Sequence, residues 1–442
     1  MTTPLWRWSD LCAALGLPLE PGPDVHRVHM DSRTTRQGDL FVALSGDPGR
    51  RFNPSARSSV DGHDYVLNAI RAGAVGALIQ KPQPPNTPQL RVADTYDGLW
   101  TLGRAARERM QGARIAITGS SGKTTAKSFL QAALDAYSAP GSFNNHIGVP
   151  LSLVNMPAAA EYGVFEVGTN HPGEIEPLAQ LIAPRVAVVL NIGSAHLENF
   201  KDTAALRKEK LSIFNALEYK DNAIWHEEID IEQGVSFGRS RRAHARLLTL
   251  DGDLATYRVF GQILTARVPG GGEHRAQTLA AVMLAVTLAQ GDIQAALELS
   301  ADLVPDGRGN EFNVQGVTVI DDSYNANPAS MQAALDAFSA RKGHGGRKVA
   351  VLGEMLELGR IGPDAHHGCV ANARHFDKVF YVGAGFQAAA STQGYDWCAI
   401  ADERLVDEVC SVLQPGDAVL VKGSNRVFWQ AQFVARLKSK LL

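Results

Sequence analysis

The sequence predicts an α/β protein of three domains, in which helices cover sheets of mostly parallel strands. Short runs of β-branched and apolar residues recur at helix-sized intervals along most of the chain. Most of these runs are apolar at successive positions, which is typical of strands that helices bury on both faces. The length of 442 residues also exceeds what one hydrophobic core usually supports. These observations favour several domains.

Residues 1–112 are predicted to form a small N-terminal domain. This part contains two turn-rich apolar pieces, at residues 38–44 (GDLFVAL) and 73–79 (GAVGALI). A proline-rich connection, residues 81–88 (KPQPPNTP), follows the second piece. We therefore expect this segment to fold separately from the residues after it.

Residues 113–310 are predicted to form a central domain around a parallel sheet. Its strands are expected at residues 114–118 (RIAIT), 164–167 (VFEV) and 186–191 (VAVVLN). Residues 311–442 are predicted to form a doubly wound C-terminal domain, and the turn-prone PDGRG at 305–309 marks the boundary. Its strands are expected at residues 317–321, 348–352, 378–382 and 418–421.

Composition narrows the classes of partner and compartment. The formal net charge is -3, from 43 basic and 46 acidic residues, so no positive excess is present to bind a nucleic acid backbone. The four cysteines are scattered without close pairs, which indicates a reducing compartment and neither a zinc site nor a disulfide framework. No apolar run is long enough to span a membrane, and no secretory leader is recognisable. We expect a cytoplasmic protein.

A phosphate-binding loop follows the first central strand. The segment GSSGKTT lies between that strand and a run with helical spacing of apolar residues, so backbone N–H groups and the helix N-terminus can surround phosphate oxygens. Ile117 stands where the common eight-residue pattern has its first glycine, and a glycine-rich turn with a chance lysine is the alternative. The expected nucleotide contacts are Gly119, Ser120, Ser121, Gly122, Lys123, Thr124 and Thr125, with the Thr124 hydroxyl as a magnesium ligand.

Three further residues are candidates for a metal site or a structural role. Glu166 interrupts an apolar strand, where a magnesium ion or hydrogen bonds from a loop would compensate its charge. His196 follows a parallel strand at its carboxyl end, where α/β sheets place ligands, although lone histidines are more often structural. Lys210 lies on an expected helix and, taken alone, is a solvated lysine.

Several segments together resemble the Mur ligase family, and specifically its MurF type. The resemblance spans nearly the whole chain. It is carried by Asp31-Ser32-Arg33 with GDLFVALSG, TGSSGKTT, SFNNHIGVPLSL at 142–153, FEVGTNHPGEI at 165–175, NIGSAHLENF at 191–200, DDSYNANP at 321–328, VLGEMLELG at 351–359 and LVKGS at 420–424. DDSYNANP and the NNHIGVP part of residues 142–153 are the most MurF-like.

The resemblance implies an ATP-dependent ligase of peptidoglycan synthesis. Members of this type activate the carboxylate of UDP-N-acetylmuramoyl-tripeptide as an acyl phosphate and join it to D-alanyl-D-alanine, which releases ADP and phosphate. The implied plan is a UDP-substrate domain, a central ATPase domain and a C-terminal Rossmann-like domain. ATP, two magnesium ions and a monomeric protein are expected.

The resemblance also assigns residues. The catalytic residues it implies are Lys123, Lys210 and His196, and the metal ligands are Thr124, Glu166, His196 and Lys210. Lys210 is expected to be carbamylated, so that it holds a second magnesium ion. The nucleotide contacts implied beyond the loop are Gln277, Arg308, Asp322, Tyr324 and Asn325. Ser32 and Arg33 match the uridine end of the substrate site, and Asn144 and Asn145 match the part that faces the muramoyl group.

The chain departs from the family pattern at two places. Gln277 stands where an adenine-contacting asparagine is expected, and its amide offers the same donor and acceptor on a longer arm. Asn425 stands where an arginine is expected, with Arg426 next. A sister ligase with another amino donor stays open, such as a MurE-like enzyme, a folylpolyglutamate synthase or a ligase of secondary metabolism. The third residue of the tripeptide, lysine or diaminopimelate, also stays open.

Overall fold

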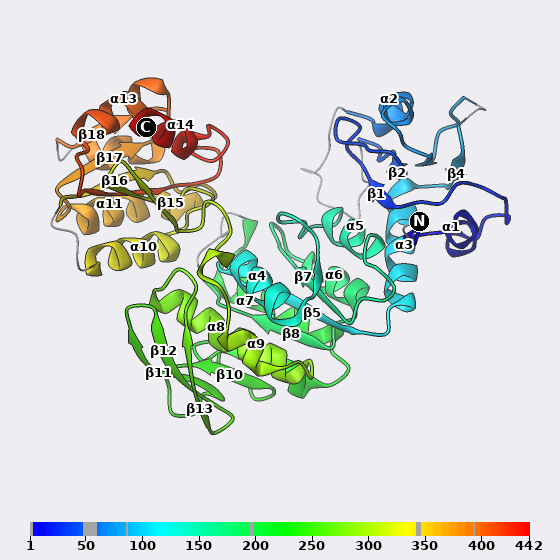
Figure 1. Cartoon of the computed structure of the whole chain (residues 1–442), viewed down its shortest axis with the longest axis horizontal. Helices are drawn as coiled ribbons and strands as arrows, with labels where there is room; N and C mark the ends of the chain where they lie inside the picture. The colour runs from blue at the N-terminus through cyan, green and yellow to red at the C-terminus, as the bar shows by residue number, and fades with distance from the viewer. Residues whose placement is uncertain (1–2, 47–59, 85–86, 194–198, 342–345, 392–393) are drawn as a thin grey trace.

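The computed structural model describes residues 3–46, 60–84, 87–193, 199–341, 346–391 and 394–442. Within these ranges it contains sheets of four, nine and six strands that follow one another along the chain. Figure 1 shows the first sheet and its helices in blue at the upper right, the second in cyan and green below, and the third in yellow to red at the upper left. The α/β class and the mostly parallel sheets are confirmed.

The first sheet is parallel throughout and has the order β1-β2-β3-β4. Its strands are β1 (Arg27–His29), β2 (Asp39–Val42), β3 (Gly76–Ile79) and β4 (Gln89–Arg91). The helices around it are α1 (Trp8–Leu15), α2 (Val66–Arg71) and α3 (Thr95–Arg109). Helix α3 also packs against α5 (Gly148–Val154) of the next part, and the indole N–H groups of Trp6 and Trp100 donate to the carbonyls of Val154 at 2.8 Å and His146 at 2.9 Å.

The second sheet has the order β13-β12-β11-β10-β9-β8-β5-β7-β6. Its strands are β5 (Ala113–Thr118), β6 (Tyr137–Ser138), β7 (Tyr162–Glu166), β8 (Val186–Val189), β9 (Ala223–His226), β10 (Val235–Gly238), β11 (Ala245–Asp251), β12 (Leu254–Val259) and β13 (Gln262–Arg267). The sequence predicted three of these strands, β5, β7 and β8, close to their observed bounds. The pairs β11–β12 and β12–β13 are antiparallel, so the expected parallel sheet carries an antiparallel extension.

Helices cover both faces of the parallel part of this sheet. They are α4 (Lys123–Leu134), α5, α6 (Ile175–Ile182), α7 (Thr203–Leu211), α8 (Glu273–Leu288) and α9 (Ile293–Leu297). Successive residues of β5 point to opposite faces. Ile115 and Ile117 pack in one core with α4 and α8, whereas Ala116 packs in the other with α5 and α6. Ile117 therefore belongs to the buried strand, and the phosphate loop begins two residues later.

The third sheet has the order β14-β15-β19-β16-β17-β18, and only the pair β14–β15 is antiparallel. Its strands are β14 (Asn310–Val314), β15 (Val317–Asp322), β16 (Lys348–Gly353), β17 (Lys378–Val382), β18 (Asp396–Cys398) and β19 (Ala418–Lys422). The four strands predicted here match β15, β16, β17 and β19 to within one residue. One core packs against α10 (Pro328–Ala340), α11 (Gly362–Ala373) and α12 (Gln387–Ser391), and the other against α13 (Glu403–Val412) and α14 (Phe433–Leu441).

Short 3-10 turns complete the structure at Gly62–Tyr65, Ser212–Ala216, Lys220–Asn222, Ala301–Leu303, Gly359–Ile361 and Ala384–Phe386. Among the described residues, no helix is both long and apolar enough to cross a membrane.

Candidate functional site

The phosphate loop lies between the end of β5 and the start of α4. Gly122 precedes the helix with φ at +81°, a conformation that glycine adopts without strain. The loop is attached to the end of β8 through Asn191, whose side-chain oxygen accepts from the Ser121 N–H at 3.0 Å and whose amide donates to the Ser121 carbonyl at 3.2 Å. Asn191 begins the NIGSAHLENF segment that carries part of the family resemblance. The structure assigns it to holding the loop in shape.

Lys123 and Thr124 begin helix α4 at the loop. The Lys123 ammonium donates to the Gly119 carbonyl at 2.7 Å and so curls back over its own loop, where outer phosphates would lie. Burial lowers the pKa of Lys123, and the negative charge of Glu166 opposes this shift. The Thr124 hydroxyl lies 3.4 Å from the Ser142 hydroxyl.

Glu166 ends strand β7 with its carboxylate in the interior. The residue is 3% exposed, and neither carboxylate oxygen has a hydrogen-bond partner among the described residues. A buried carboxylate without hydrogen bonds is unfavourable unless a cation compensates it. The loop hydrogen bonds that the sequence left open as an alternative are thus not found in this part of the chain. Carboxylate oxygens are the ligands that magnesium prefers, so Glu166 fits a metal ligand.

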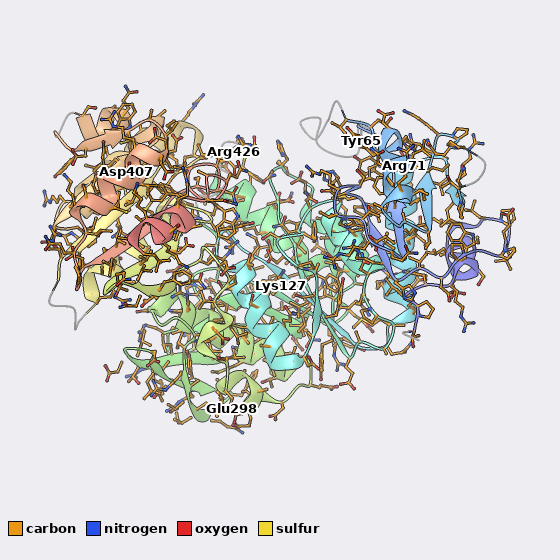
Figure 2. The ribbon with its side chains drawn as sticks, turned by 45° about the horizontal axis from the view of Figure 1, so that its top comes forward. Tyr65, Arg71, Lys127, Glu298, Asp407 and Arg426 are labelled. Carbon is orange, nitrogen blue, oxygen red and sulfur yellow. The ribbon has the colours of Figure 1, made fainter. Side chains whose placement is uncertain are left out.

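Lys127 is a residue that the sequence analysis missed. It lies one helical turn after Lys123 on α4, near the centre of the molecule (Figure 2), and is 6% exposed. Its ammonium lies 3.7 Å from Glu166 Oε1 and donates to the carbonyls of Ala139 at 2.7 Å and Gly141 at 2.5 Å. The signal that could have revealed it is its position among apolar residues on the buried side of the helix.

Lys210 is buried on α7 and is not the solvated lysine that its helix suggested. The residue is 1% exposed. Burial, with the nearby positive charge of Lys123, lowers the pKa of Lys210 to about 7, whereas Glu209 opposes the shift. Its charge interactions link it to the phosphate loop. Near pH 7, a substantial fraction of such a buried lysine is therefore the neutral amine.

Glu209, the neighbour of Lys210, has a structural role. Its carboxylate accepts three backbone N–H bonds, from Gly173 at 2.7 Å, Glu174 at 2.9 Å and Ile175 at 2.8 Å. These groups lie at the start of α6, where backbone donors have no partner inside the helix. Glu209 therefore ties α7, with Lys210, to the beginning of α6. His196, the other predicted metal ligand, lies outside the described residues.

Residues from the third sheet and its approach segment face the phosphate loop. The Arg308 guanidinium lies 4.3 Å from the centre of the Tyr324 ring, and the Tyr324 hydroxyl lies 3.5 Å from the Ser142 hydroxyl. Since Ser142 also neighbours Thr124, these contacts connect the C-terminal part to the loop. Positive charge from Arg308 also lowers the pKa of Lys123, after burial as the main cause.

Asp322 and Asn325 lie at the carboxyl end of β15 and just after it. The buried Lys422 donates to Asp322 Oδ2 at 2.7 Å and to the Asn325 carbonyl at 3.2 Å. Lys422 belongs to a motif that the sequence analysis quoted, yet it received no role there. It holds the loop after β15 against the end of β19.

Gln277 lies on α8, where its side-chain oxygen is 3.2 Å from His226 Nε2. His226 is the last residue of β9, so this pair joins the first part of α8 to the carboxyl end of that strand. The Arg275 guanidinium, on the same helix, donates to the Arg308 carbonyl at 2.7 Å. Helix α8 therefore connects the predicted adenine contact to the approach segment of the third sheet.

Asn144 and Asn145 have different surroundings. The Asn145 side chain accepts from the N–H groups of Ile147 at 3.1 Å and Gly148 at 2.9 Å, which is a helix-capping role at the start of α5. The Asn144 carbonyl accepts from Gly168 N–H at 2.8 Å, and its side chain lies so close to Gly168 that an added Cβ would approach its Cγ to 2.8 Å. Asn144 is thus held at the end of β7, beside Glu166.

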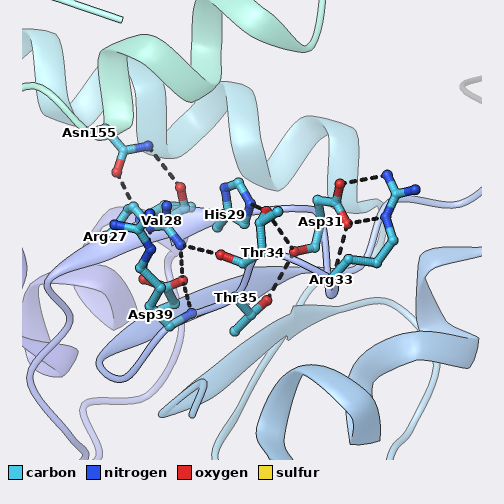
Figure 3. Close-up of polar contacts among 10 residues, drawn as sticks. Arg27, Val28, His29, Asp31, Arg33, Thr34, Thr35, Asp39 and Asn155 are labelled. Carbon is cyan, nitrogen blue, oxygen red and sulfur yellow. Dashed lines mark hydrogen bonds and ion pairs between the residues drawn. The ribbon is translucent and has the colours of Figure 1, made fainter. Parts of the chain in front are cut away.

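Ser32 and Arg33 lie between β1 and β2 of the first sheet. They are far from the phosphate loop in the sequence and belong to a different sheet. Arg33 forms two side-chain hydrogen bonds with Asp31, at 2.9 Å and 2.7 Å (Figure 3), and its side chain is 85% exposed. The hydrogen bond with Arg33 holds the pKa of Asp31 at about 2. The same loop is fastened by Thr34 and Thr35, and Arg27 pairs with the buried Asp39 beneath it.

Comparisons with known proteins agree with this arrangement. The Mur ligase middle domain family matches residues 117–285, and the Mur ligase glutamate ligase domain family matches residues 307–425. The UDP-N-acetylmuramoyl-tripeptide--D-alanyl-D-alanine ligase of Rickettsia prowazekii is 30% identical over 96% of this chain and 98% of its own. A crystal structure of MurF from Acinetobacter baumannii has a TM-score of 0.83 at 27% identity and covers 98% of this chain and 99% of its own. The MurF ligase of Thermotoga maritima in complex with ADP has a TM-score of 0.76 at 26% identity, over 94% of this chain and 97% of its own.

Proposed function

The chain belongs to the Mur ligase family, and we propose that the residues around its phosphate loop carry out the reaction for which its relatives are named. The protein is an ATP-dependent peptide ligase of the MurF type, which adds D-alanyl-D-alanine to UDP-N-acetylmuramoyl-tripeptide in peptidoglycan synthesis. A sister ligase with a different amino donor is not favoured, because a relative named for this reaction matches nearly the whole chain. The observation that carries the site assignment is the buried carboxylate of Glu166 beside the phosphate loop, whose oxygens have no hydrogen-bond partner among the described residues.

The phosphate loop would hold the ATP phosphates. Backbone N–H groups of residues 119–125 surround the β-phosphate, and Lys123 reaches the outer phosphates once its bond to the Gly119 carbonyl is exchanged. Gln277 contacts the adenine, and the contacts from the C-terminal part are Arg308, Asp322, Tyr324 and Asn325. The stacking of Arg308 on Tyr324 supports this grouping, since it keeps a cation directed towards the loop.

Thr124, Glu166, His196 and Lys210 would hold two magnesium ions. When bound, these ions would supply positive charge that neutralises the triphosphate. Glu166 supports this proposal because neither of its oxygens has a hydrogen-bond partner in the part of the chain that the structure describes. Lys210 can join as an anion if its neutral amine binds carbon dioxide and loses a proton to form a carbamate. Its burial supports that modification.

The reaction would proceed in two displacements. The terminal carboxylate of the tripeptide attacks the γ-phosphorus of ATP, the bond to the β–γ bridging oxygen breaks, and ADP leaves. The amine of D-alanyl-D-alanine then attacks the acyl carbon, phosphate leaves, and the nitrogen loses a proton to give the amide. Lys123 supplies positive charge to the transferring group throughout, since positioning and charge neutralisation dominate such transfers.

The remaining assignments concern the substrate and the organisation of the chain. Ser32 and Arg33 would contact the uridine end of the substrate, while Asn144 and Asn145 face the muramoyl group, Asn145 through the start of α5 that it caps. We propose three domains, residues 1–112, 113–310 and 311–442, with closure of the third over the loop when substrates bind. We also propose that the protein works as a monomer in the cytoplasm, where ATP is available.

Phosphate release tests the proposed function directly. ATP is supplied with UDP-N-acetylmuramoyl-tripeptide, carrying either lysine or diaminopimelate, in the presence and absence of D-alanyl-D-alanine. We expect phosphate release to depend on the dipeptide, with formation of the pentapeptide product. Phosphate release that is independent of the dipeptide, or that is faster with a single amino acid as the amino donor, would contradict the proposal. A Glu166→Gln variant is the matched control for the proposed metal ligand, because it keeps the shape of the side chain and removes its charge.

A further inference from the structure

The buried ammonium of Lys127 has no part in the reaction described above. It lies on α4 one turn after Lys123, the lysine that bonds to the loop carbonyl of Gly119. Instead it is enclosed between the end of β7 and the backbone of residues 139–141. Buried lysines are rare unless they are paired, so this cation calls for an explanation.

Two of the contacts of this ammonium fix its position. It donates to the carbonyls of Ala139 at 2.7 Å and Gly141 at 2.5 Å, and the second of these contacts is short for a hydrogen bond. Neither carbonyl carries a formal charge, so these bonds hold the ammonium without neutralising it. They also fasten the segment that leads to Ser142, the neighbour of Thr124.

The third contact is electrostatic. The ammonium lies 3.7 Å from Glu166 Oε1, within ion-pair distance but beyond hydrogen-bond distance, so both carboxylate oxygens keep their lone pairs free. Lys123, the other lysine at the loop, is already bonded to the Gly119 carbonyl. Lys127 is therefore the cation that the structure pairs with Glu166 among the described residues.

We propose that Lys127 is the resident counter-ion of Glu166, a positioning residue that keeps this carboxylate in place before a metal ion arrives. Once magnesium is bound, the same positive charge repels it and limits how tightly the site holds the ion. This inference rests on the proposed function only in taking Glu166 as a metal ligand. The pairing of the two side chains in the metal-free protein does not depend on that role.

A double-mutant cycle in the metal-free protein tests the pairing. Lys127→Met removes both the charge and the hydrogen bonds, Lys127→Gln keeps a donor for the carbonyls, and each is made in the natural and the Glu166→Gln background. In EDTA we expect both variants to lower the unfolding temperature by several degrees in the natural background, and Lys127→Gln to lower it much less when residue 166 is neutral. Equal losses in both backgrounds would overturn the proposal, because they would leave Lys127 with a purely structural role.

Binding of Mn²⁺ in the presence of ADP, followed by electron paramagnetic resonance, tests the effect on the metal. We expect Lys127→Gln to bind Mn²⁺ about 3- to 10-fold more tightly than the natural protein, because a repelling charge is gone. Unchanged or weaker binding would overturn this part. If Glu166→Gln binds Mn²⁺ as well as the natural protein, the metal-ligand assignment of Glu166 fails, whereas the coupling measured in EDTA still decides whether the two residues are paired.

Discussion

Lys210 illustrates how a single buried residue can acquire a chemistry that its type does not suggest. On the surface its amine would stay protonated at neutral pH, but burial and the charge of Lys123 bring its pKa to about 7. Carbon dioxide reacts only with the neutral amine. Proton release from this residue is thus the step that makes carbamylation possible near physiological pH.

We expect carbamate formation on Lys210 to follow this pKa. The neutral fraction increases as pH rises through about 7, so at a fixed concentration of dissolved carbon dioxide the recovery of activity should accelerate through that range and level off about one unit above it. The experiment removes carbon dioxide at low pH and then records the initial rate of reactivation against pH. A midpoint near 10 would instead indicate an ordinary, solvated lysine.

Removal of the Lys210 side chain provides a second test at the residue scale. Lys210→Ala should lower kcat at least about 100-fold, because a metal ligand contributes several kcal/mol to transition-state stabilisation. Short carboxylic acids should restore part of the activity by supplying the missing carboxylate. Undiminished activity of the unrescued variant would refute the carbamate, and Lys208→Ala on the same helix serves as the control.

Among the elements, helices α6 and α7 are held together by the carboxylate of Glu209. Glu209 accepts three N–H bonds at the start of α6 and so fixes α7, together with Lys210, beside the sheet. Negative charge at a helix N-terminus is favourable because it interacts with the exposed backbone donors. The position of Lys210 is therefore a consequence of helix capping between two elements.

We expect Glu209→Gln to destabilise the protein by about 1–3 kcal/mol, since bonds to a charged acceptor are weakened and one buried N–H group loses its partner. The measurement is urea unfolding at neutral pH. Glu218→Gln, an exposed position just after this segment, is the control and should change stability by less than about 0.5 kcal/mol. Equal stability of the Glu209 variant and the control would contradict the capping role.

At the scale of the whole molecule, Tyr324 connects the C-terminal part to Ser142, the neighbour of Thr124 in the phosphate loop. The Tyr324 ring lies between the Arg308 guanidinium and the Ser142 hydroxyl, and it also packs edge-on against Trp429 with the ring centres 5.3 Å apart. An interface that consists of an aromatic ring and a weak hydroxyl contact can adjust when ATP binds.

The ring of Tyr324 should matter more than its hydroxyl. Tyr324→Ala removes the ring on which the Arg308 guanidinium stacks. A cation–π contact contributes about 0.5–2 kcal/mol, so we expect the KM for ATP to rise roughly 2- to 30-fold. Tyr324→Phe keeps the ring and should raise the KM less than about 3-fold, since only one neutral hydrogen bond is lost. Steady-state kinetics with varied ATP compares the two variants, and equal effects would place the main contribution in the hydroxyl.

The sequence predicted features that depend on neighbouring residues, such as strands, and missed contacts between residues that are far apart in the chain. Continuous apolar runs identified β5, β8 and four strands of the third sheet almost to the residue. The strands β11–β13 escaped because buried and exposed residues alternate along β11 and β12, as in a sheet with one exposed face. Lys127 was missed although it lies among apolar residues on the buried side of α4, and Lys422 was missed because its partner Asp322 is 100 residues away in the chain.

The phosphate loop and the strand pattern were determined by the sequence itself, since glycine conformation and apolar periodicity act over a few residues. The tertiary structure decided the charges around that loop. Lys127 meets Glu166 and Lys422 meets Asp322 across long stretches of chain, and only the folded protein removes Lys210 from water. The physical reason is that a side chain's charge depends on its solvation and its partners, and both are set by contacts between distant segments.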